Sequence, residues 1–220
     1  MGIFKAYDIR GLHPAEIHPD IARKIGRAFS ALLGPGAVVV GRDVRVHSPE
    51  IADAVCAGLV DVGRKVIDIG LASTPMAYYA IGSRDVAGGL VVTASHNPGE
   101  YNGMKLCREE AKPVAYTTGI DVIEAACAGD GPSAGAESGS VEALDLNADY
   151  YAHVASFAKL SEPVKVAIDA ANGMAGYTLP GILKLIPEIQ ADSIFMEPDG
   201  TFPNHEANPL KEENLDPVRE

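Results

Sequence analysis

Residues 88–98, with the sequence Gly-Gly-Leu-Val-Val-Thr-Ala-Ser-His-Asn-Pro, form the stretch that decides the fold class. Residues 88–92 make an apolar run of strand length, which is typical of a strand buried on both faces of a sheet. Pro98 lacks an amide N–H and disfavours the helical conformation of Asn97, so the strand passes into a shaped loop. Because ligands of α/β sheets bind beyond the carboxyl ends of the strands, Ser95 falls where a site is expected.

The loop after this strand gathers side chains that suit phosphoryl transfer. Ser95 has a hydroxyl that can act as a nucleophile, and His96 and Asn97 can donate hydrogen bonds to phosphate oxygens. His96 has an alternative role in orienting the loop through backbone hydrogen bonds, and Asn97 has one as a turn former. We predict that Ser95 and His96 are catalytic and that Asn97 binds phosphate.

Lys105 follows in the segment Tyr-Asn-Gly-Met-Lys at residues 101–105. Met104 and Leu106 flank it, and strand alternation puts both apolar side chains on one face and Lys105 on the other. Gly103 allows close approach of another backbone segment. We predict that Lys105 is catalytic, as a general acid/base or as an electrostatic clamp, rather than a solvated surface lysine.

The composition is that of an ordinary globular protein. The 220 residues are 47% hydrophobic and 22% charged, which suits one large domain or two small ones. The formal net charge of −12 argues against non-specific binding to nucleic acid or to anionic lipid. The apolar runs are too short for a membrane span, and residues 1–5 lack the pattern of a signal peptide. Three cysteines without metal-ligand spacing, Cys56, Cys107 and Cys127, predict a reducing cytoplasm.

Strand-like and helix-like patterns alternate along the chain, which predicts an α/β fold. The patterns predict helices at residues 21–32, 51–62, 74–81, 147–160 and 177–185, and strands at 37–40, 65–69, 88–92, 164–168 and 193–196. Ser48 and Thr74 are predicted to cap helices that continue with Pro49 and Pro75. We expect a three-layer α/β/α domain with a mixed, mostly parallel sheet, followed by an incomplete second domain of similar type.

A change in composition suggests where the two domains meet. Turn-forming residues dominate between residues 129 and 140 and predict a linker or surface loop. We therefore expect a first domain at residues 1–143 and a partial second domain at 144–220. The stretch 197–220 shows no periodicity, and two strands fall short of a stable sheet, so we expect an N-terminal portion of a longer protein.

Several motifs, in this order along the chain, carry a family resemblance. They are Ile-Phe-Lys-Ala-Tyr-Asp-Ile-Arg-Gly at 3–11, Gly-Arg-Asp-Val-Arg at 41–45, Thr-Ala-Ser-His-Asn-Pro at 93–98, Val-Ala-Ile-Asp-Ala-Ala-Asn-Gly at 166–173 and Pro-Asp-Gly-Thr-Phe-Pro-Asn at 198–204. With these motifs the chain resembles the α-D-phosphohexomutases and, among them, the bacterial phosphomannomutase/phosphoglucomutase group.

The resemblance implies an isomerase of carbohydrate metabolism that interconverts the 1-phosphate and 6-phosphate of mannose or glucose. Ser95 would carry a phosphoryl group, and its phosphate would be a ligand of Mg²⁺. Hexose 1,6-bisphosphate would be the intermediate and activator, and hexose phosphate the substrate. The family's aspartate-rich metal loop is absent from residues 1–220, so we expect this stretch alone to show negligible turnover.

The resemblance also extends to residues in the N-terminal part of the chain. The resemblance implies that Arg10 faces the active cleft, where its planar guanidinium would suit phosphate oxygens, and an ordinary surface ion pair is the alternative. Tyr7 is expected to line the substrate, with packing as the alternative. Arg42, Asp43 and Arg45 are expected to form a salt-bridge network that supports the loop.

Residues 169–173 resemble a phosphate-loop turn. Asp169, Asn172 and Gly173 follow a predicted strand and precede a predicted helix, and a purely structural turn is the alternative.

Three other functions stay open at this point. A phosphoglucosamine mutase is the alternative within the family, although the opening motif fits that group less well. A serine phosphatase would pass the phosphoryl group of Ser95 to water, and bisphosphate-dependent turnover separates it from a mutase. A non-catalytic sugar-phosphate binding fragment is the third. The sequence leaves the preferred sugar and the oligomeric state open.

Overall fold

The computed structural model describes residues 2–129, 132–135 and 138–219 and divides into two compact units. The first unit comprises Met1–Asp43, His47–Ala94 and Glu100–Leu144. The second comprises Val44–Val46, Ser95–Gly99 and Asp145–Glu220. The loop that carries Ser95 therefore packs with the second unit, although the strand that leads into it belongs to the first.

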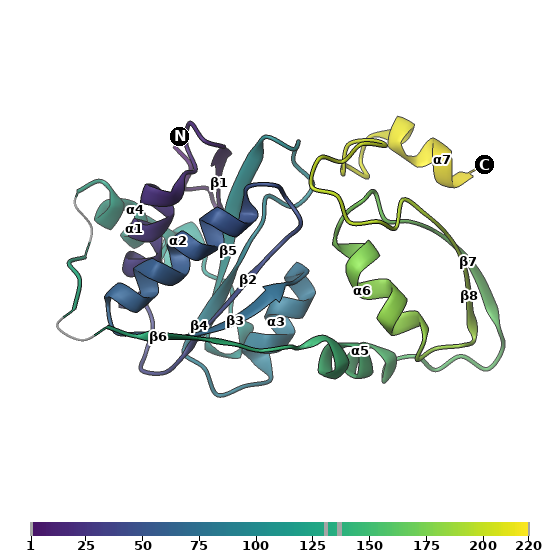
Figure 1. Ribbon diagram of the computed structural model, residues 1–220, viewed down its shortest axis with the longest axis horizontal. Coiled ribbons are helices and arrows are strands. Elements are labelled where there is room, and N and C mark those ends of the chain that lie inside the picture. Colours follow the sequence, from purple (N-terminus) through teal and green to yellow (C-terminus); the bar gives the residue numbers. More distant parts are fainter. Residues whose placement is uncertain (1, 130–131, 136–137, 220) are drawn as a thin grey trace. The chain divides into compact units, whose positions relative to one another are not determined.

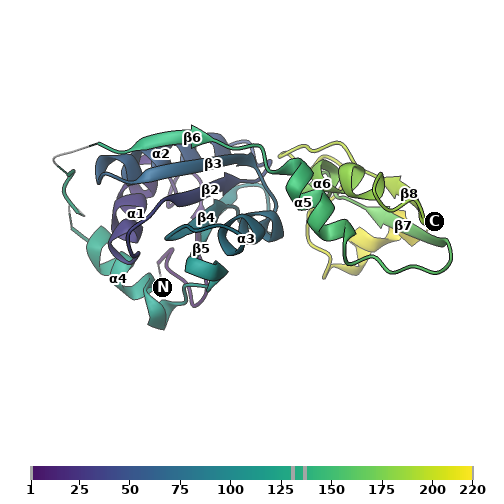
Figure 2. The same ribbon diagram turned by 90° about the horizontal axis from the view of Figure 1, so that it is seen from below.

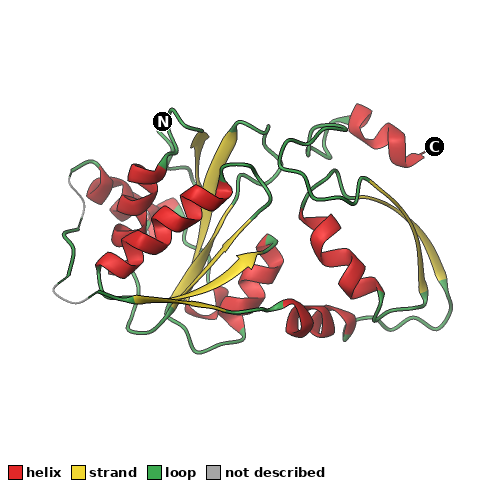
Figure 3. Ribbon diagram, viewed as in Figure 1, coloured by secondary structure: helices red, strands yellow, loops and turns green. Residues whose placement is uncertain are grey.

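The first unit is built on a six-stranded sheet with the strand order β1-β5-β4-β2-β3-β6. Neighbours β4, β2, β3 and β6 run parallel, whereas β5 is antiparallel to both β4 and β1. The predicted mixed, mostly parallel sheet is confirmed (Figures 1 and 3). The strands are β1 (Ile9–Leu12), β2 (Val38–Arg42), β3 (Lys65–Leu71), β4 (Gly88–Val92), β5 (Tyr101–Arg108) and β6 (Ser140–Ala143).

Helices cover both faces of this sheet (Figure 2). One face carries α1 (Pro19–Ala31), α2 (Ser48–Asp61) and α4 (Ile120–Cys127), whose apolar side chains share one core with those of the sheet. The other face carries α3 (Thr74–Gly82). All five residues of β4 are buried, as the unbroken apolar run at 88–92 predicted, because helices exclude water from both of its faces. Two short 3₁₀ turns, Glu109–Ala111 and Tyr116–Thr118, follow β5.

Glycines set the close approach of α1 to α2. A side chain at Gly26 would place its Cβ 2.5 Å from the carbonyl oxygen of Val55. A side chain at Gly58 would overlap the carbonyl oxygen of Arg23 in the same way. The two helix backbones therefore touch where these glycines lie, and this contact permits α1 and α2 to pack together on one face of the sheet.

The two predicted helix caps are wrong. α2 begins at Ser48 itself, and the Ser48 hydroxyl donates a 2.5 Å hydrogen bond to Asp43 Oδ1 instead of accepting one from the helix. At α3 the cap is Ser73, whose Oγ accepts from the amide of Met76 at 3.3 Å, one residue before the predicted Thr74. In each case two polar residues precede the proline, and the first of them, not the predicted second one, lies at the N-cap.

The second unit pairs β7 (Val164–Asp169) in parallel with β8 (Ile189–Ile194). Its helices are α5 (Asn147–Ala155), α6 (Met174–Leu183) and α7 (Asp216–Arg219), with a 3₁₀ turn at Glu212–Leu215. α5 ends earlier than predicted, and β8 begins and ends earlier than the predicted strand at 193–196, which it overlaps at residues 193–194. Phe195 has a left-handed backbone with φ of 52°, which ends β8 inside the apolar run that suggested a strand.

Two further predictions concern the linker and the possibility of a membrane span. Part of the predicted linker at 129–140, namely residues 130, 131, 136 and 137, lies outside the described residues. Within the described ranges, no helix is both long enough and apolar enough to cross a membrane.

Candidate active site

Ser95 lies exposed at the start of the loop that follows β4. Its backbone is left-handed, with φ of 57°, which is uncommon for a residue with a side chain and occurs often at functional sites. Its hydroxyl is 3.3 Å from Nδ1 of His96, which is also exposed. The structure therefore presents the predicted nucleophile with one imidazole nitrogen within hydrogen-bonding reach.

Arg45 holds the backbone of this loop. Its side chain is 1% exposed, and it donates hydrogen bonds to the carbonyl oxygens of Ser95 at 3.0 Å, Asn97 at 2.7 Å and Pro98 at 2.7 Å. The predicted support of the loop by the 42–45 motif is thus present, through loop carbonyl groups that accept from Arg45. Asp43 Oδ1 accepts a hydrogen bond from the hydroxyl of Ser48, and the salt-bridge network expected among Arg42, Asp43 and Arg45 stays a prediction.

Arg10 and Lys105 lie on one face of the sheet in the first unit. Arg10 pairs with Gly103 across β1 and β5, and Lys105 is two residues along β5 from Gly103, so the three share a face. Met104 and Leu106 lie on the other face, in the core, which confirms the predicted alternation. Gly103 is required because a Cβ there would overlap the carbonyl oxygen of Ile9.

Asp8 is a residue of this face that the sequence analysis did not assign. Its Oδ2 lies 3.3 Å from Nζ of Lys105, and the two side chains are 15% and 25% exposed. The carboxylate orients the ammonium group on the sheet surface. Its position beside Tyr7 in the opening motif was the signal that could have identified it. Tyr7 itself is 80% exposed, so its side chain contributes little to packing.

A buried polar network that sequence reasoning missed lies where β5 begins. Asn102 is fully buried, and its Nδ2 lies 2.7 Å from Nδ1 of His47 and 3.1 Å from the hydroxyl of Ser48. Its Oδ1 accepts from the amide of Gly103 at 2.8 Å. Because the Asn102 amide nitrogen donates, Nδ1 of His47 is the acceptor and the proton sits on Nε2. The network fixes the start of α2 against β5.

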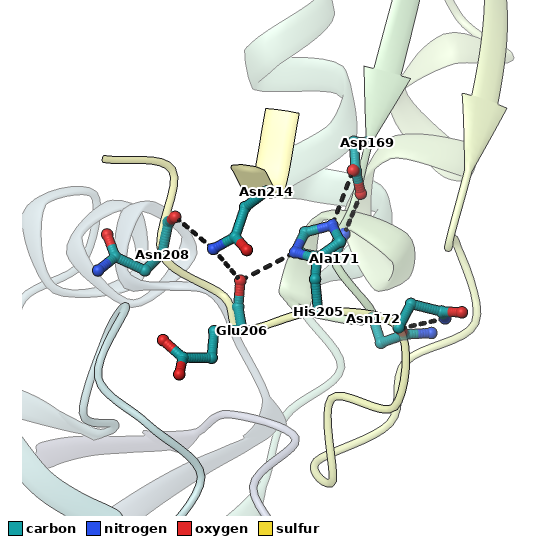
Figure 4. A network of polar contacts seen from close by, with 8 residues as sticks. Asp169, Ala171, Asn172, His205, Glu206, Asn208 and Asn214 are labelled. Atoms are coloured by element: carbon teal, nitrogen blue, oxygen red, sulfur yellow. Dashed lines mark hydrogen bonds and ion pairs between the residues drawn. The ribbon is translucent and has the colours of Figure 1, made fainter. Parts of the chain in front are cut away.

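The turn at residues 169–173 is occupied by bonds within its own unit (Figure 4). Oδ1 of Asp169 accepts from the amide of Ala171 at 2.7 Å. Asn172 is 4% exposed; its Nδ2 donates to the carbonyl of Glu197, and its Oδ1 accepts from Asn204. These contacts favour the structural interpretation of the turn over the phosphate-binding one.

His205 completes this network. Its Nε2 lies 2.8 Å from Oδ2 of Asp169, and its Nδ1 lies 2.9 Å from the carbonyl oxygen of Glu206 (Figure 4). Asn214 donates to the same Glu206 carbonyl at 3.0 Å and to that of Asn208 at 2.8 Å. Both ring nitrogens of His205 face acceptors, and only the imidazolium can donate from both. Partial burial opposes the charge, but the hydrogen bonds to Glu206 and Asp169 outweigh it and raise the pKa of His205 above its ordinary value.

The three cysteines are free and buried. Burial raises the pKa of Cys56 to about 12 and that of Cys107 and Cys127 to about 11, so thiolate is scarce at neutral pH. They do not take part in the candidate site.

Taken together, the fold and the loop define an α/β protein with an exposed serine beyond the carboxyl end of a central strand. The model of the phosphoglucomutase/phosphomannomutase alpha/beta/alpha domain I matches residues 1–130, and that of domain II matches residues 148–220. The chain belongs to the phosphoglucomutase/phosphomannomutase family, and the resemblance found in the sequence is confirmed.

Individual relatives agree with this assignment. Phosphohexose mutases of Xanthomonas campestris pv. campestris are 44% identical over 97% of this chain and 48% of their own length. A phosphomannomutase of Escherichia coli is 39% identical over 99% of this chain and 50% of its own. The crystal structure of a phosphoglucomutase/phosphomannomutase family protein from Burkholderia thailandensis matches with a TM-score of 0.90 and 36% identity, over 98% of this chain and 48% of that one. The chain spans about half the length of the curated relatives it matches.

Proposed function

We propose that the protein is a phosphohexomutase that moves a phosphoryl group between Ser95 and the hydroxyls of a hexose phosphate. The observation that carries the proposal is Ser95 itself, exposed and left-handed beyond a fully buried strand, in a chain of this family. Mannose and glucose phosphates are the proposed substrates, since the related proteins are named for them.

In the proposed reaction, a sugar hydroxyl attacks the phosphorus of phosphorylated Ser95. A P–O bond to the sugar forms while the bond to Ser95 Oγ breaks, and a hexose bisphosphate results. The proton lost by the sugar hydroxyl ends on Ser95 Oγ, and we assign its delivery to Lys105. The second half-reaction runs in reverse at the other phosphate and restores the phosphoserine.

In this proposal the other site residues bind the phosphate, orient the Ser95 hydroxyl or contact the substrate. Arg10 binds phosphate oxygens through its planar fork of donors. His96 lies within reach of Ser95 Oγ and orients it, and Asn97 donates to the phosphate. Tyr7, with its exposed ring, lines the substrate.

Mg²⁺ is the cofactor that we propose, with the phosphate of Ser95 as one ligand. When bound, the ion would neutralise charge on the transferred group. Residues 2–129, 132–135 and 138–219 contain no group of three His, Cys, Asp or Glu side chains placed to hold a metal ion. The described residues thus fit only the phosphate side of such a site, and no step above is assigned to the metal.

Incubation with hexose 1,6-bisphosphate tests the proposal. The protein, expressed as its gene encodes it, is treated with glucose 1,6-bisphosphate and Mg²⁺, and its peptides are mapped by mass spectrometry. We expect one phosphoryl group on Ser95, none in Ser95→Ala, and conversion of mannose 1-phosphate that depends on the bisphosphate. Phosphorylation of a different residue, or full turnover by Ser95→Ala, would refute the assignment. Net release of inorganic phosphate without isomerisation would indicate the phosphatase instead.

A further inference from the structure

We infer that Phe202 is a positioning residue for the nucleophile loop and that it acts through Arg45. The effect of Phe202 on catalysis, as inferred here, rests on the proposed function. Phe202 belongs to the segment Pro-Asp-Gly-Thr-Phe-Pro-Asn, far from Ser95 in sequence but in the same compact unit as Arg45 and Ser95–Gly99.

The contact is a cation–π pair. Cζ of Arg45 lies 5.2 Å from the centroid of the Phe202 ring, within the range of attraction between a guanidinium and an aromatic face. The same guanidinium donates to three carbonyl oxygens of the Ser95 loop. A Cβ built on Gly99 would lie 3.9 Å from Cδ2 of Phe202, so the ring also borders the end of the loop. Phe202 thus limits how far the guanidinium can swing away from the loop.

The backbone of Phe202 is held in an unfavourable conformation. Its φ of 51° is left-handed, which is rare for a bulky residue and indicates that surrounding contacts enforce it. Those contacts are present: the amide of Phe202 donates to the carbonyl of Asp199 at 3.0 Å. Oδ1 of Asp199 accepts from both the amide and the hydroxyl of Thr201, and the amide of Asp199 donates to Asn172.

Gly200 brings this turn against the backbone of the arginine segment. A Cβ there would overlap the carbonyl oxygen of Val44 and would lie 2.7 Å from Cα of Arg45. Only glycine permits so close an approach. The turn therefore contacts Arg45 from two sides, through Gly200 on its backbone and Phe202 on its guanidinium.

Packing alone does not account for this arrangement. Phe202 is only partly buried, so an ordinary apolar contact there would not require a strained backbone. Two left-handed residues, Ser95 and Phe202, both contact Arg45. If Phe202 loses its aromatic face, Arg45 gains freedom, and the carbonyls that define the loop lose a fixed donor. The backbone of Ser95 can then leave its left-handed conformation.

The test combines amide hydrogen exchange with phosphoryl-transfer kinetics on the protein as its gene encodes it. Phe202→Leu keeps an apolar side chain and removes the ring, whereas Phe202→Tyr keeps the ring. Phe157→Leu, at a ring that is 70% exposed, is the matched control. Gly200→Ala is a second variant that displaces the turn without changing any aromatic residue.

We expect Phe202→Leu and Gly200→Ala to accelerate exchange at residues 95–99 about tenfold, with exchange in β2 and β4 unchanged. The rate of Ser95 phosphorylation by the bisphosphate should fall by a similar factor while the KM changes little, because orientation and not binding is lost. Phe202→Tyr and Phe157→Leu should behave like the wild type.

Unchanged exchange at residues 95–99 in Phe202→Leu would overturn the inference. So would equal acceleration throughout the second unit, because that would mark Phe202 as a general stabiliser. The exchange measurement does not require Ser95 to react. Absence of Ser95 phosphorylation in the wild type would therefore refute the proposed function. The exchange rates of residues 95–99 would still test the role of Phe202.

Discussion

The ammonium group of Lys105 lies 3.3 Å from the carboxylate of Asp8, and this pair fixes the lysine on the sheet face that it shares with Arg10. Lys105 projects from β5 beside β4, pairing with Val91 near the end of the strand that leads into the Ser95 loop. The pair places a positive charge at a defined point on that face.

Replacement of Lys105 by methionine should therefore impair turnover rather than folding. We expect kcat for bisphosphate-dependent isomerisation to fall by about a hundredfold, the usual effect of losing a proton-transfer group. Asp8→Asn should cause a smaller loss, because the ammonium remains but loses its anchor. Lys112→Met, which removes an exposed lysine paired with Glu109 and Glu110, is the control. A kcat for Lys105→Met equal to that of the control would contradict the assignment.

The His205–Asp169 pair should make the stability of the second unit depend on pH. The folded protein raises the pKa of His205 above the value near 6.5 that it has when unfolded. The charged ring therefore stabilises the fold fully below about pH 6.5, and this contribution disappears as the pH rises through the folded pKa. Urea unfolding between about pH 5 and pH 8 should show this loss.

His205→Gln should remove this component of the pH dependence. His18→Gln, in the first unit, provides the matched control and should retain it. An identical pH profile for His205→Gln and the wild type would show that the pair does not couple to folding.

Asp61 should contribute to acid stability. The hydrogen bond from Arg23 lowers the pKa of Asp61 to about 2; burial opposes this shift, and Arg27 adds to it. The charged carboxylate therefore stabilises the protein above about pH 3.8, and the contribution is lost as the pH falls toward 2. Asp61→Asn should reduce the free energy of unfolding at neutral pH by on the order of 1 kcal/mol, since Arg23 is half exposed and solvent screens the pair.

The measurement for Asp61 is the free energy of unfolding as a function of pH, followed into the acid range. The wild type should lose stability relative to Asp61→Asn as the pH falls, until the two curves meet. Asp53→Asn on the same helix is a suitable comparison. Parallel curves for the wild type and Asp61→Asn down to the lowest pH would contradict the prediction.

Gly58→Ala should separate α1 from α2. The added methyl group would overlap the carbonyl oxygen of Arg23, a backbone atom that can move only with its helix. We expect a loss of about 2 kcal/mol in the free energy of unfolding, measured by thermal or urea denaturation. Gly34→Ala, where a Cβ meets nothing within 4 Å, should be nearly neutral. Equal stability of the two variants would mean that the helices can part at no cost.

The amino-acid sequence by itself determined the elements whose burial is periodic. The run at 88–92 predicted β4, and the alternation around Lys105 predicted the two faces of β5. Apolar spacing located α1 and α2 to within a few residues. These features are local, because a strand or helix that buries one face repeats apolar residues at its own period. The family motifs identified Ser95 for the same reason, as a short contiguous string.

Tertiary structure alone decided which distant groups meet. β6 joins the sheet through four residues that are all exposed, so pairing with β3 and not burial of one face selects this strand. Arg45 turned out to hold loop carbonyls, and Phe202 to contact Arg45. His205 contacts Asp169, although the two residues lie far apart in the sequence. Hydrogen bonds and cation–π contacts leave no periodic trace in a sequence, since they depend on where the folded backbone brings two side chains within a few ångströms.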